Sequence, residues 1–173
     1  MPGDAPWYEA AHVVGITNAL NVVADGLGEL MAPVKAEGAP PDVAAVFTDI
    51  RAFYAGRAGE IPLPFGLAAH DAGYLADLWA AWKRAFVDNR LGRRLKTALA
   101  FAVSLTTRSA FGTAFHLAEM RRLGVGEGGV MEIVGVTQMF SSYTKIADTL
   151  QLEPDMGDIA PVDRTPAPEA DGR

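Results

Sequence analysis

The sequence predicts an all-α protein of about six to eight helices. Apolar residues recur at intervals of three and four along most of the chain, which is the spacing of one helix face. No segment sustains the apolar–polar alternation of a strand, and the sequence contains no internal repeat. Gly, Pro and Asp residues separate the periodic segments, so we expect distinct helices that pack as a bundle.

The periodic segments define the helices in chain order. We expect them at Trp7–Met31, Asp42–Tyr54, Phe65–His70, Ala72–Asn89, Leu91–Thr107, Ser109–Leu123 and about Gly128–Leu150. Asp42 and Asp71 are suitable helix caps. Trp79 and Trp82, three residues apart, are expected in the core. Leu91–Thr107 is the most apolar segment, so we expect a helix that is buried on most sides.

The composition fits one globular domain and excludes several classes of function. Of the 173 residues, 50% are hydrophobic, which is enough to bury a core without crosslinks. The absence of cysteine excludes disulfides, thiolate metal sites and thiol redox chemistry. A net charge of −6 argues against a nucleic-acid partner. The chain lacks a basic start and a long apolar run, so we expect a cytoplasmic protein with no membrane partner.

The composition changes near residue 150. Residues 151–173 contain four prolines and six acidic residues against two arginines, a net charge of −4. We therefore expect a helical domain at 1–150, followed by an acidic, Pro-rich and flexible tail at 151–173.

Several segments resemble one known superfamily. In the second half they are Leu95–Ser104, Ser109–His116 and Phe140–Asp148, and in the first half Ile50–Tyr54, Leu67–Asp71 and Leu75–Trp79. Together they resemble the AhpD-like superfamily of alkylhydroperoxidase D proteins and carboxymuconolactone decarboxylases, over roughly residues 42 to 152. The resemblance implies an AhpD-like helical bundle that assembles into dimers, trimers or hexamers, with sites near the subunit contacts.

The redox members of that superfamily carry a glutamate and then CxxCxxxH at the start of a helix, where a thiol pKa is lowered. On this chain the glutamate falls on Thr97, the two cysteines on Ser109 and Gly112, and the histidine on His116. A hydroxyl cannot form a disulfide, and glycine has no side chain. Disulfide-based peroxide reduction is therefore excluded.

His116 is the remaining member of the pattern and the candidate catalytic residue. Ser109 lies seven residues earlier, about 10 Å away on a straight helix, which argues against a Ser–His nucleophile pair. Gly112, one turn before His116, is expected to leave a notch for a water or a small ligand. Two interpretations stay open: His116 faces this pocket as a general acid or base, or it is a core histidine satisfied by a neighbour.

The decarboxylases of the superfamily work without a redox pair. They carry a histidine in a segment that resembles Phe115–Gly124, where Arg121 and Arg122 can meet a carboxylate. The ending Tyr143–Asp148 instead resembles the peroxidase-related branch. The helical haloacid dehalogenases, related in shape, activate water with a carboxylate, and no carboxylate of this chain maps onto that role.

The other histidines are weaker candidates. His70 beside Asp71 fits a helix-end histidine better than a second acid–base group. His12, with Asn18 and Asn21, forms a polar stripe for a pocket or a subunit contact. The three histidines lack ligand spacing, so we predict no metal and no cofactor. Asp148 is expected to pair with Arg94 or Lys96.

Two functions are compatible with the sequence. The first is a cofactor-independent, lyase- or decarboxylase-like enzyme in which His116 moves a proton on a small organic acid. Its predicted substrate-binding residues are Thr97, Arg108, Ser109, Gly112, Thr113 and Arg121. The second is a non-catalytic protein on the same scaffold that binds a small molecule or assembles. In both, the expected partner is a further copy of the chain.

Overall fold

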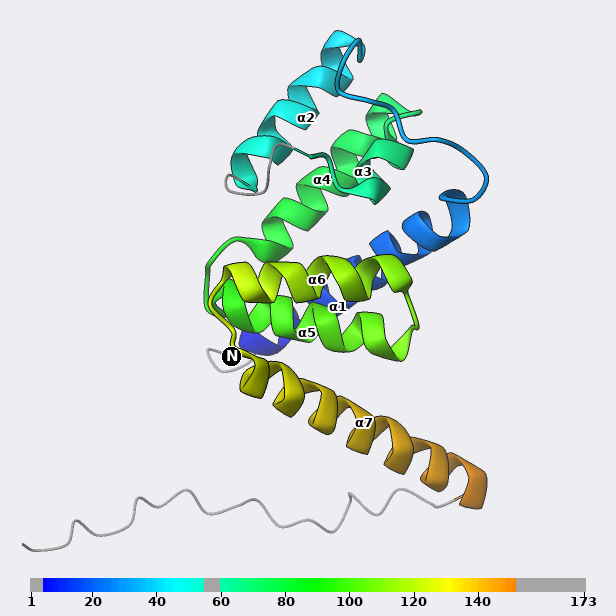
Figure 1. Ribbon diagram of the computed structural model, residues 1–173, viewed down its shortest axis with the longest axis vertical. Coiled ribbons are helices and arrows are strands. Elements are labelled where there is room, and N and C mark those ends of the chain that lie inside the picture. Colours follow the sequence, from blue (N-terminus) through cyan, green and yellow to red (C-terminus); the bar gives the residue numbers. More distant parts are fainter. Residues whose placement is uncertain (1–4, 55–59, 152–173) are drawn as a thin grey trace, which may run out of the picture.

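The computed structural model describes residues 5–54 and 60–151. Within these residues it contains seven helices and no strand (Figure 1). The helices are α1 (Ala5–Leu27), α2 (Pro41–Phe53), α3 (Leu63–Ala68), α4 (Ala72–Phe86), α5 (Arg93–Thr106), α6 (Ala110–Arg122) and α7 (Glu127–Leu150). The predicted all-α class is confirmed. The predicted tail lies, from residue 152 onward, outside the described residues.

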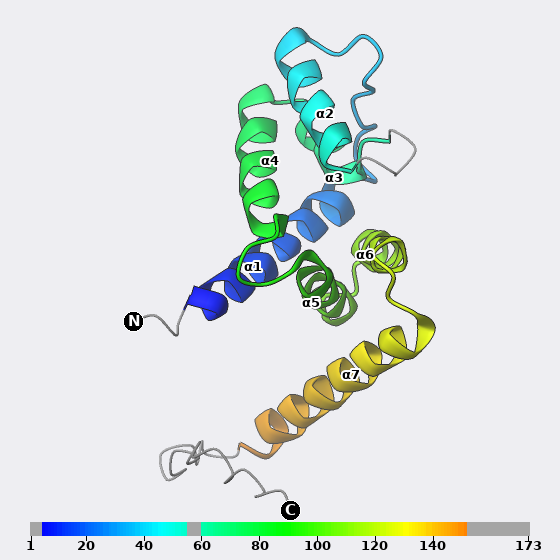
Figure 2. The ribbon, with the colours of Figure 1, turned by 90° about the vertical axis from the view of Figure 1, so that its left-hand side faces the viewer.

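The helices form two groups joined by α1. α2, α3 and α4 pack together at one end, and α5 pairs with α6 at the other (Figures 1 and 2). The long α1 runs along both groups and contacts α3, α4, α5 and α6. α7 lies against α5 and extends away from the rest of the bundle (Figure 2).

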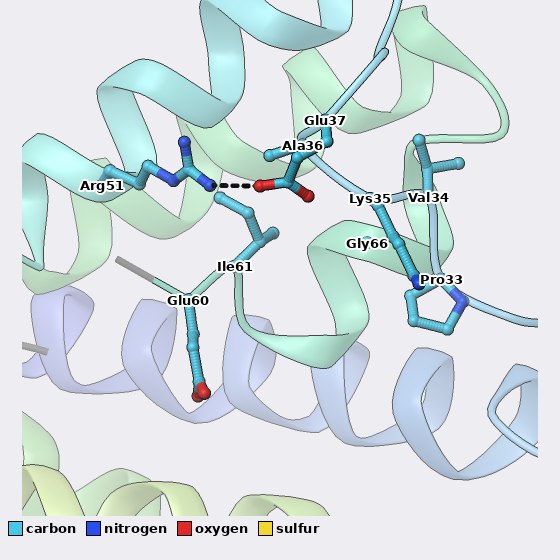
Figure 3. Close-up of a pocket in the computed structure, with 9 residues that line it drawn as sticks. All are labelled: Pro33, Val34, Lys35, Ala36, Glu37, Arg51, Glu60, Ile61 and Gly66. Carbon is cyan, nitrogen blue, oxygen red and sulfur yellow. Dashed lines mark ion pairs between the residues drawn. The ribbon is translucent and has the colours of Figure 1, made fainter. Parts of the chain in front are cut away.

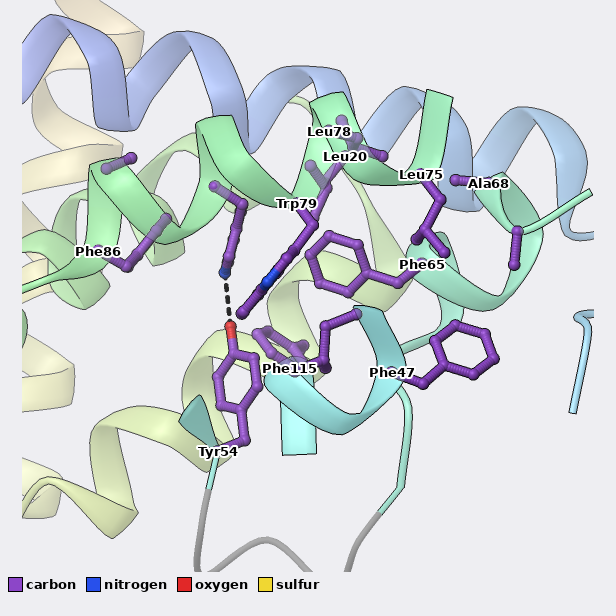
Figure 4. Packing of buried hydrophobic residues seen from close by; sticks show 14 of the residues in the cluster. Leu20, Phe47, Tyr54, Phe65, Ala68, Leu75, Leu78, Trp79, Phe86 and Phe115 are labelled. Atoms are coloured by element: carbon purple, nitrogen blue, oxygen red, sulfur yellow. Dashed lines mark hydrogen bonds between the residues drawn. The ribbon is translucent and has the colours of Figure 1, made fainter. Parts of the chain in front are cut away.

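An aromatic cluster fills the core between α2, α3, α4 and α6 (Figure 4). Trp79 and Trp82 are 4% and 1% exposed, so their predicted core positions are confirmed. The indole of Trp82 donates to Tyr54 Oη at 2.6 Å, and that of Trp79 donates to Asp49 Oδ2 at 2.7 Å. Each buried N–H therefore has the partner that burial of a polar group requires.

One predicted cap is correct and the other is wrong. Asp71 caps α4, and its Oδ1 accepts from the Tyr74 amide at 2.9 Å. α2 begins earlier than predicted, with Pro41 in its first position after Pro40. Proline has no N–H to satisfy and a φ suited to the first helical turn. Asp42 therefore lies inside that turn, where a carboxylate is still favourable at the positive end of the helix.

The expectation that the most apolar helix is buried on most sides is confirmed, because every residue from Lys96 to Leu105 is buried or half-buried. Leu95, before this stretch, is 49% exposed. The buried face also includes the polar side chains of Lys96, Thr97 and Ser104, and Lys96 and Ser104 pair with polar residues of α1. The expected pairing of Asp148 is wrong. Lys96 instead pairs with Glu9 of α1, and Arg94 donates to the Leu123 carbonyl at 3.0 Å.

Candidate functional site

The candidate site begins at the tight link between α5 and α6. Ser109 is 1% exposed and caps α6: its Oγ accepts from the Gly112 amide at 3.0 Å. Its own amide donates to the Ser104 carbonyl at 3.0 Å. The hydroxyl and the backbone amide of Ser109 therefore both help to hold the start of α6, as expected for a helix cap.

The expected notch at Gly112 is filled. A Cβ added there would lie closer than 3.0 Å to Asn21 Oδ1 of α1 and to Ser104 Oγ of α5. The Asn21 amide donates to Ser104 Oγ at 3.1 Å and to Thr107 Oγ1 at 3.2 Å. The missing side chain thus allows three helices to approach one another, and polar groups of α1 and α5 occupy the space. Asn18, by contrast, is exposed, so the predicted polar stripe of α1 does not share one surface.

His116 lies inside the aromatic cluster and is 2% exposed. Its ring is nearly parallel to that of Trp82 at a centroid distance of 5.8 Å and to that of Phe86 at 6.1 Å. The Phe115 ring meets it edge-on at 5.2 Å. Trp82 and Phe86 stack on each other at 4.1 Å, so the imidazole lies beside this pair with the edge-on Phe115 ring as a further neighbour. A catalytic role for His116 stays a prediction.

The other predicted site residues do not line one pocket with His116. Thr97 is fully buried, and its Oγ1 donates to the Arg93 carbonyl at 2.8 Å. Thr113 is half-buried on α6, and Arg121 is exposed near the end of that helix. Arg108 is exposed in the link and lines a cleft against α7.

Two neighbouring hollows lie beside α3. One, of about 320 Å³, lies between the start of α3 and the residues Phe111 and Phe115 of α6. The second, of about 420 Å³, shares Pro33, Glu60 and Ile61 with it and contains the Arg51–Glu37 ion pair (Figure 3). Phe115 therefore faces a hollow and also contacts His116.

The remaining histidines lie apart from this region. His12 lines a shallow hollow of about 250 Å³ with Tyr8, Arg84 and Arg90. His70 is exposed, and its Nε2 lies 3.0 Å from the Ala32 carbonyl oxygen. Among the described residues, no three histidine or carboxylate side chains converge as a metal site would require. Within the same residues, no helix is both long and apolar enough to cross a membrane.

No family model matches the sequence, and no curated protein matches it either. Among solved structures, the chain is similar to the alkylhydroperoxidase AhpD core from Rhodospirillum rubrum, with a TM-score of 0.67 and 21% identity. The match covers 76% of this chain and 99% of that one. The fold is AhpD-like.

The AhpD-like fold implied by the resemblance is thereby confirmed. Identity of 21% establishes the fold and leaves the chemistry to the residues that this chain carries. The chain has no cysteine, which is consistent with the absence of the CxxC pair. The positions predicted for that pair, Ser109 and Gly112, cap α6 and hold it against its neighbours.

The AhpD-like core also holds charged residues that the sequence analysis missed. Glu119 is 3% exposed and accepts from Arg93 Nη2 at 3.0 Å and from Arg122 Nη2 at 2.6 Å. The Glu119 carboxylate raises the pKa of Arg122. The Arg93 guanidinium also lies 4.2 Å from the Phe53 ring centroid. Glu119 and Arg122 are three residues apart, a spacing from which their ion pair could have been predicted. No local pattern identifies Arg93, 26 residues before Glu119, as the second partner of that carboxylate.

Proposed function

We propose that this protein is a non-catalytic assembly module, a homo-oligomer that joins its copies through α7. The supporting observation is that none of the 24 residues of α7 is buried against the described part of the chain. Seven large apolar side chains on this helix are 51–69% exposed: Met131, Val136, Met139, Phe140, Tyr143, Ile146 and Leu150. An exposed apolar patch of this extent is unusual for a monomer and is typical of an interaction surface.

The apolar side chains of α7 face two directions. Ile133, Val134 and Thr137 are half-buried on the side that packs on α5. Six of the seven exposed residues, all except Met131, recur every three or four positions from Val136 to Leu150, so they form a second stripe, which we call the α7 stripe. A helix that is apolar on both sides is normally covered on both.

A second copy of the chain is the partner that fits the α7 stripe. No charged residue lies between Glu132 and Lys145, and depletion of charge is typical of the centre of a stable interface. A single continuous stripe can pair with its own copy across a twofold axis, the commonest symmetry of soluble oligomers.

The α5–α6 region supports the non-catalytic part of the proposal. Ser109 serves as a helix cap, and Gly112 brings three helices together. His116 packs beside the stacked rings of Trp82 and Phe86. Each of these residues has a packing role that requires no substrate.

Light scattering coupled to size exclusion tests the assembly proposal on the full chain. We expect the wild type to elute at a multiple of 18.3 kDa and Phe140→Glu to shift to the monomer. Ile146→Glu tests the same stripe independently. Ser141→Glu, which adds the same charge to the exposed side of α7 opposite the stripe, serves as the matched control and keeps the wild-type size. A monomeric wild type, or folded stripe variants that keep the oligomer, would contradict the proposal.

One observation favours a second function, the acid–base enzyme. Phe115 both lines the 320 Å³ hollow and contacts His116, so displacement of this ring would connect the imidazole with a space of ligand size. The test is release of carbon dioxide from unsaturated lactone carboxylic acids. Under the assembly proposal His116→Gln lowers the melting temperature and the wild type shows no turnover. Turnover that His116→Gln abolishes, without loss of folding, would establish the enzyme instead.

A further inference from the structure

A cleft lies between the α5–α6 link and α7. It has a volume of about 380 Å³ and lies where α7 packs on the end of α5. Its lining consists of Leu105, Thr106, Arg108, Val134, Thr137, Gln138, Ser141 and Lys145. The volume falls in the range of small-molecule sites, which is about 300–1,000 Å³.

The charges that line this cleft are both positive. They belong to Arg108 and Lys145, and no carboxylate lies among the lining residues. Within the described part of the chain, neither side chain has an ion-pair or hydrogen-bond partner. Asp148, one turn after Lys145, is also not within ion-pair distance of it. Two cations left facing the same hollow, in a chain of net charge −6, point to an anionic ligand.

The backbone at Arg108 gives an independent indication. Arg108 has a φ of 58°, in the left-handed region that glycine adopts without cost. The turn is fixed on both sides, because the Arg108 amide donates to the Leu105 carbonyl at 3.3 Å and the next amide donates to Ser104. An L-residue at such a φ costs about 1 kcal/mol, and strained residues of this kind cluster at ligand sites. The turn itself needs no side chain, so the guanidinium of Arg108 is left available to the cleft that it lines.

The rest of the lining narrows the class of ligand. Thr106 Oγ1 and Thr137 Oγ1 donate to carbonyls of their own helices, so Arg108 and Lys145 are the groups that can meet the charge of the ligand. Leu105 and Val134 supply the apolar part of the lining. A guanidinium matches a carboxylate through two parallel hydrogen bonds. We propose that this cleft binds a small organic carboxylate with an apolar body, its carboxylate on Arg108 and Lys145 and its body against Leu105 and Val134.

This inference does not rest on the proposed function. Gln138, Ser141 and Lys145 lie on a different side of α7 from the α7 stripe, because 100° separates successive residues on a helix. The cleft can therefore stay open when the α7 stripe is covered. Light scattering tests the α7 stripe, whereas ligand titration tests the cleft. The two proposals can therefore fail separately.

Calorimetric titration of the full chain with benzoate tests the cleft. Benzamide, which has the same ring without the charge, and inorganic phosphate, which has charge without an apolar body, are the comparison probes. We expect benzoate to bind, to bind more weakly at high salt, and to bind at least tenfold more tightly than either comparison probe. Failure of benzoate to bind at millimolar concentration would overturn the proposal. Benzamide or phosphate binding equally well would also overturn it.

Arg108→Gly separates a binding role from a structural one. This variant should relieve the backbone cost and keep or raise the melting temperature, while benzoate affinity falls at least tenfold. Lys145→Gln should also weaken benzoate binding at least tenfold. Arg90→Gln removes an exposed cation outside the cleft and should leave the affinity unchanged. Unchanged affinity in Arg108→Gly, or an equal loss in Arg90→Gln, would overturn the proposal.

Discussion

Gly112 lies where α1, α5 and α6 meet, and the absence of its side chain permits that contact. Asn21 Oδ1 and Ser104 Oγ occupy the space that a Cβ would need. Gly112→Ala should therefore lower the free energy of unfolding by about 1–3 kcal/mol, the usual cost of overpacking. Urea denaturation measures the change.

Gly15 provides the matched control within α1. A Cβ at this position has no atom within 4 Å, so Gly15→Ala gains helix propensity without a clash. It should raise the free energy of unfolding by about 0.5–1 kcal/mol. Similar changes in the two variants would show that the close approach at Gly112 does not limit the packing of the helices.

The same residues show how far the sequence could predict the site. Local spacing was enough to place Ser109 at the start of a helix and His116 two turns later. It could not show that the side of Gly112 is closed, because that depends on Asn21, a residue far away in the chain. Nor could it show that His116 lies beside the stacked rings of Trp82 and Phe86. These contacts follow from how the helices cross, which no local pattern contains.

At the scale of helices, α1 and α5 are joined by a buried ion pair. Lys96 is fully buried, pairs with Glu9 and donates to the Val87 carbonyl at 2.6 Å. Glu9→Gln leaves the ammonium buried without its counter-charge, which should cost about 3 kcal/mol of unfolding free energy. Chemical denaturation of the single variants and the double variant measures the coupling.

Lys96→Met in the Glu9→Gln background tests whether the two residues are energetically coupled. It replaces the unpaired charge by an apolar side chain of similar length, so the double variant should recover most of the lost stability. Two losses that simply add would show that Glu9 and Lys96 act independently. The apolar composition of α5 predicted its burial on most sides, but it could not predict that Lys96 would be buried against a carboxylate of α1.

Two of the ion pairs that join helices lower the pKa of their carboxylate. Glu9 links α1 to α5, and its hydrogen bond with Lys96 lowers its pKa. Asp49 links α2 to α4: Lys83 Nζ lies 2.8 Å from it, and hydrogen bonds from Lys83 and then Trp79 lower its pKa. These are the carboxylates whose pKa values are lowered in the folded chain, so they should carry much of the dependence of stability on pH.

The direction of that dependence follows from the lowered pKa values. In the folded state each carboxylate stays ionised to a lower pH than in the unfolded state, so the unfolded chain binds more protons on acidification. The stabilisation is fully present above the ordinary carboxyl pKa of about 4 and is lost as the pH falls through the lowered folded values. The free energy of unfolding of the wild type should therefore decline as the pH is lowered from about 5 to 2. The Glu9→Gln and Asp49→Asn variants should each be less stable at neutral pH and show a shallower decline. Denaturation series across this range measure both slopes, and a decline as steep as in the wild type would show that other carboxylates control acid unfolding.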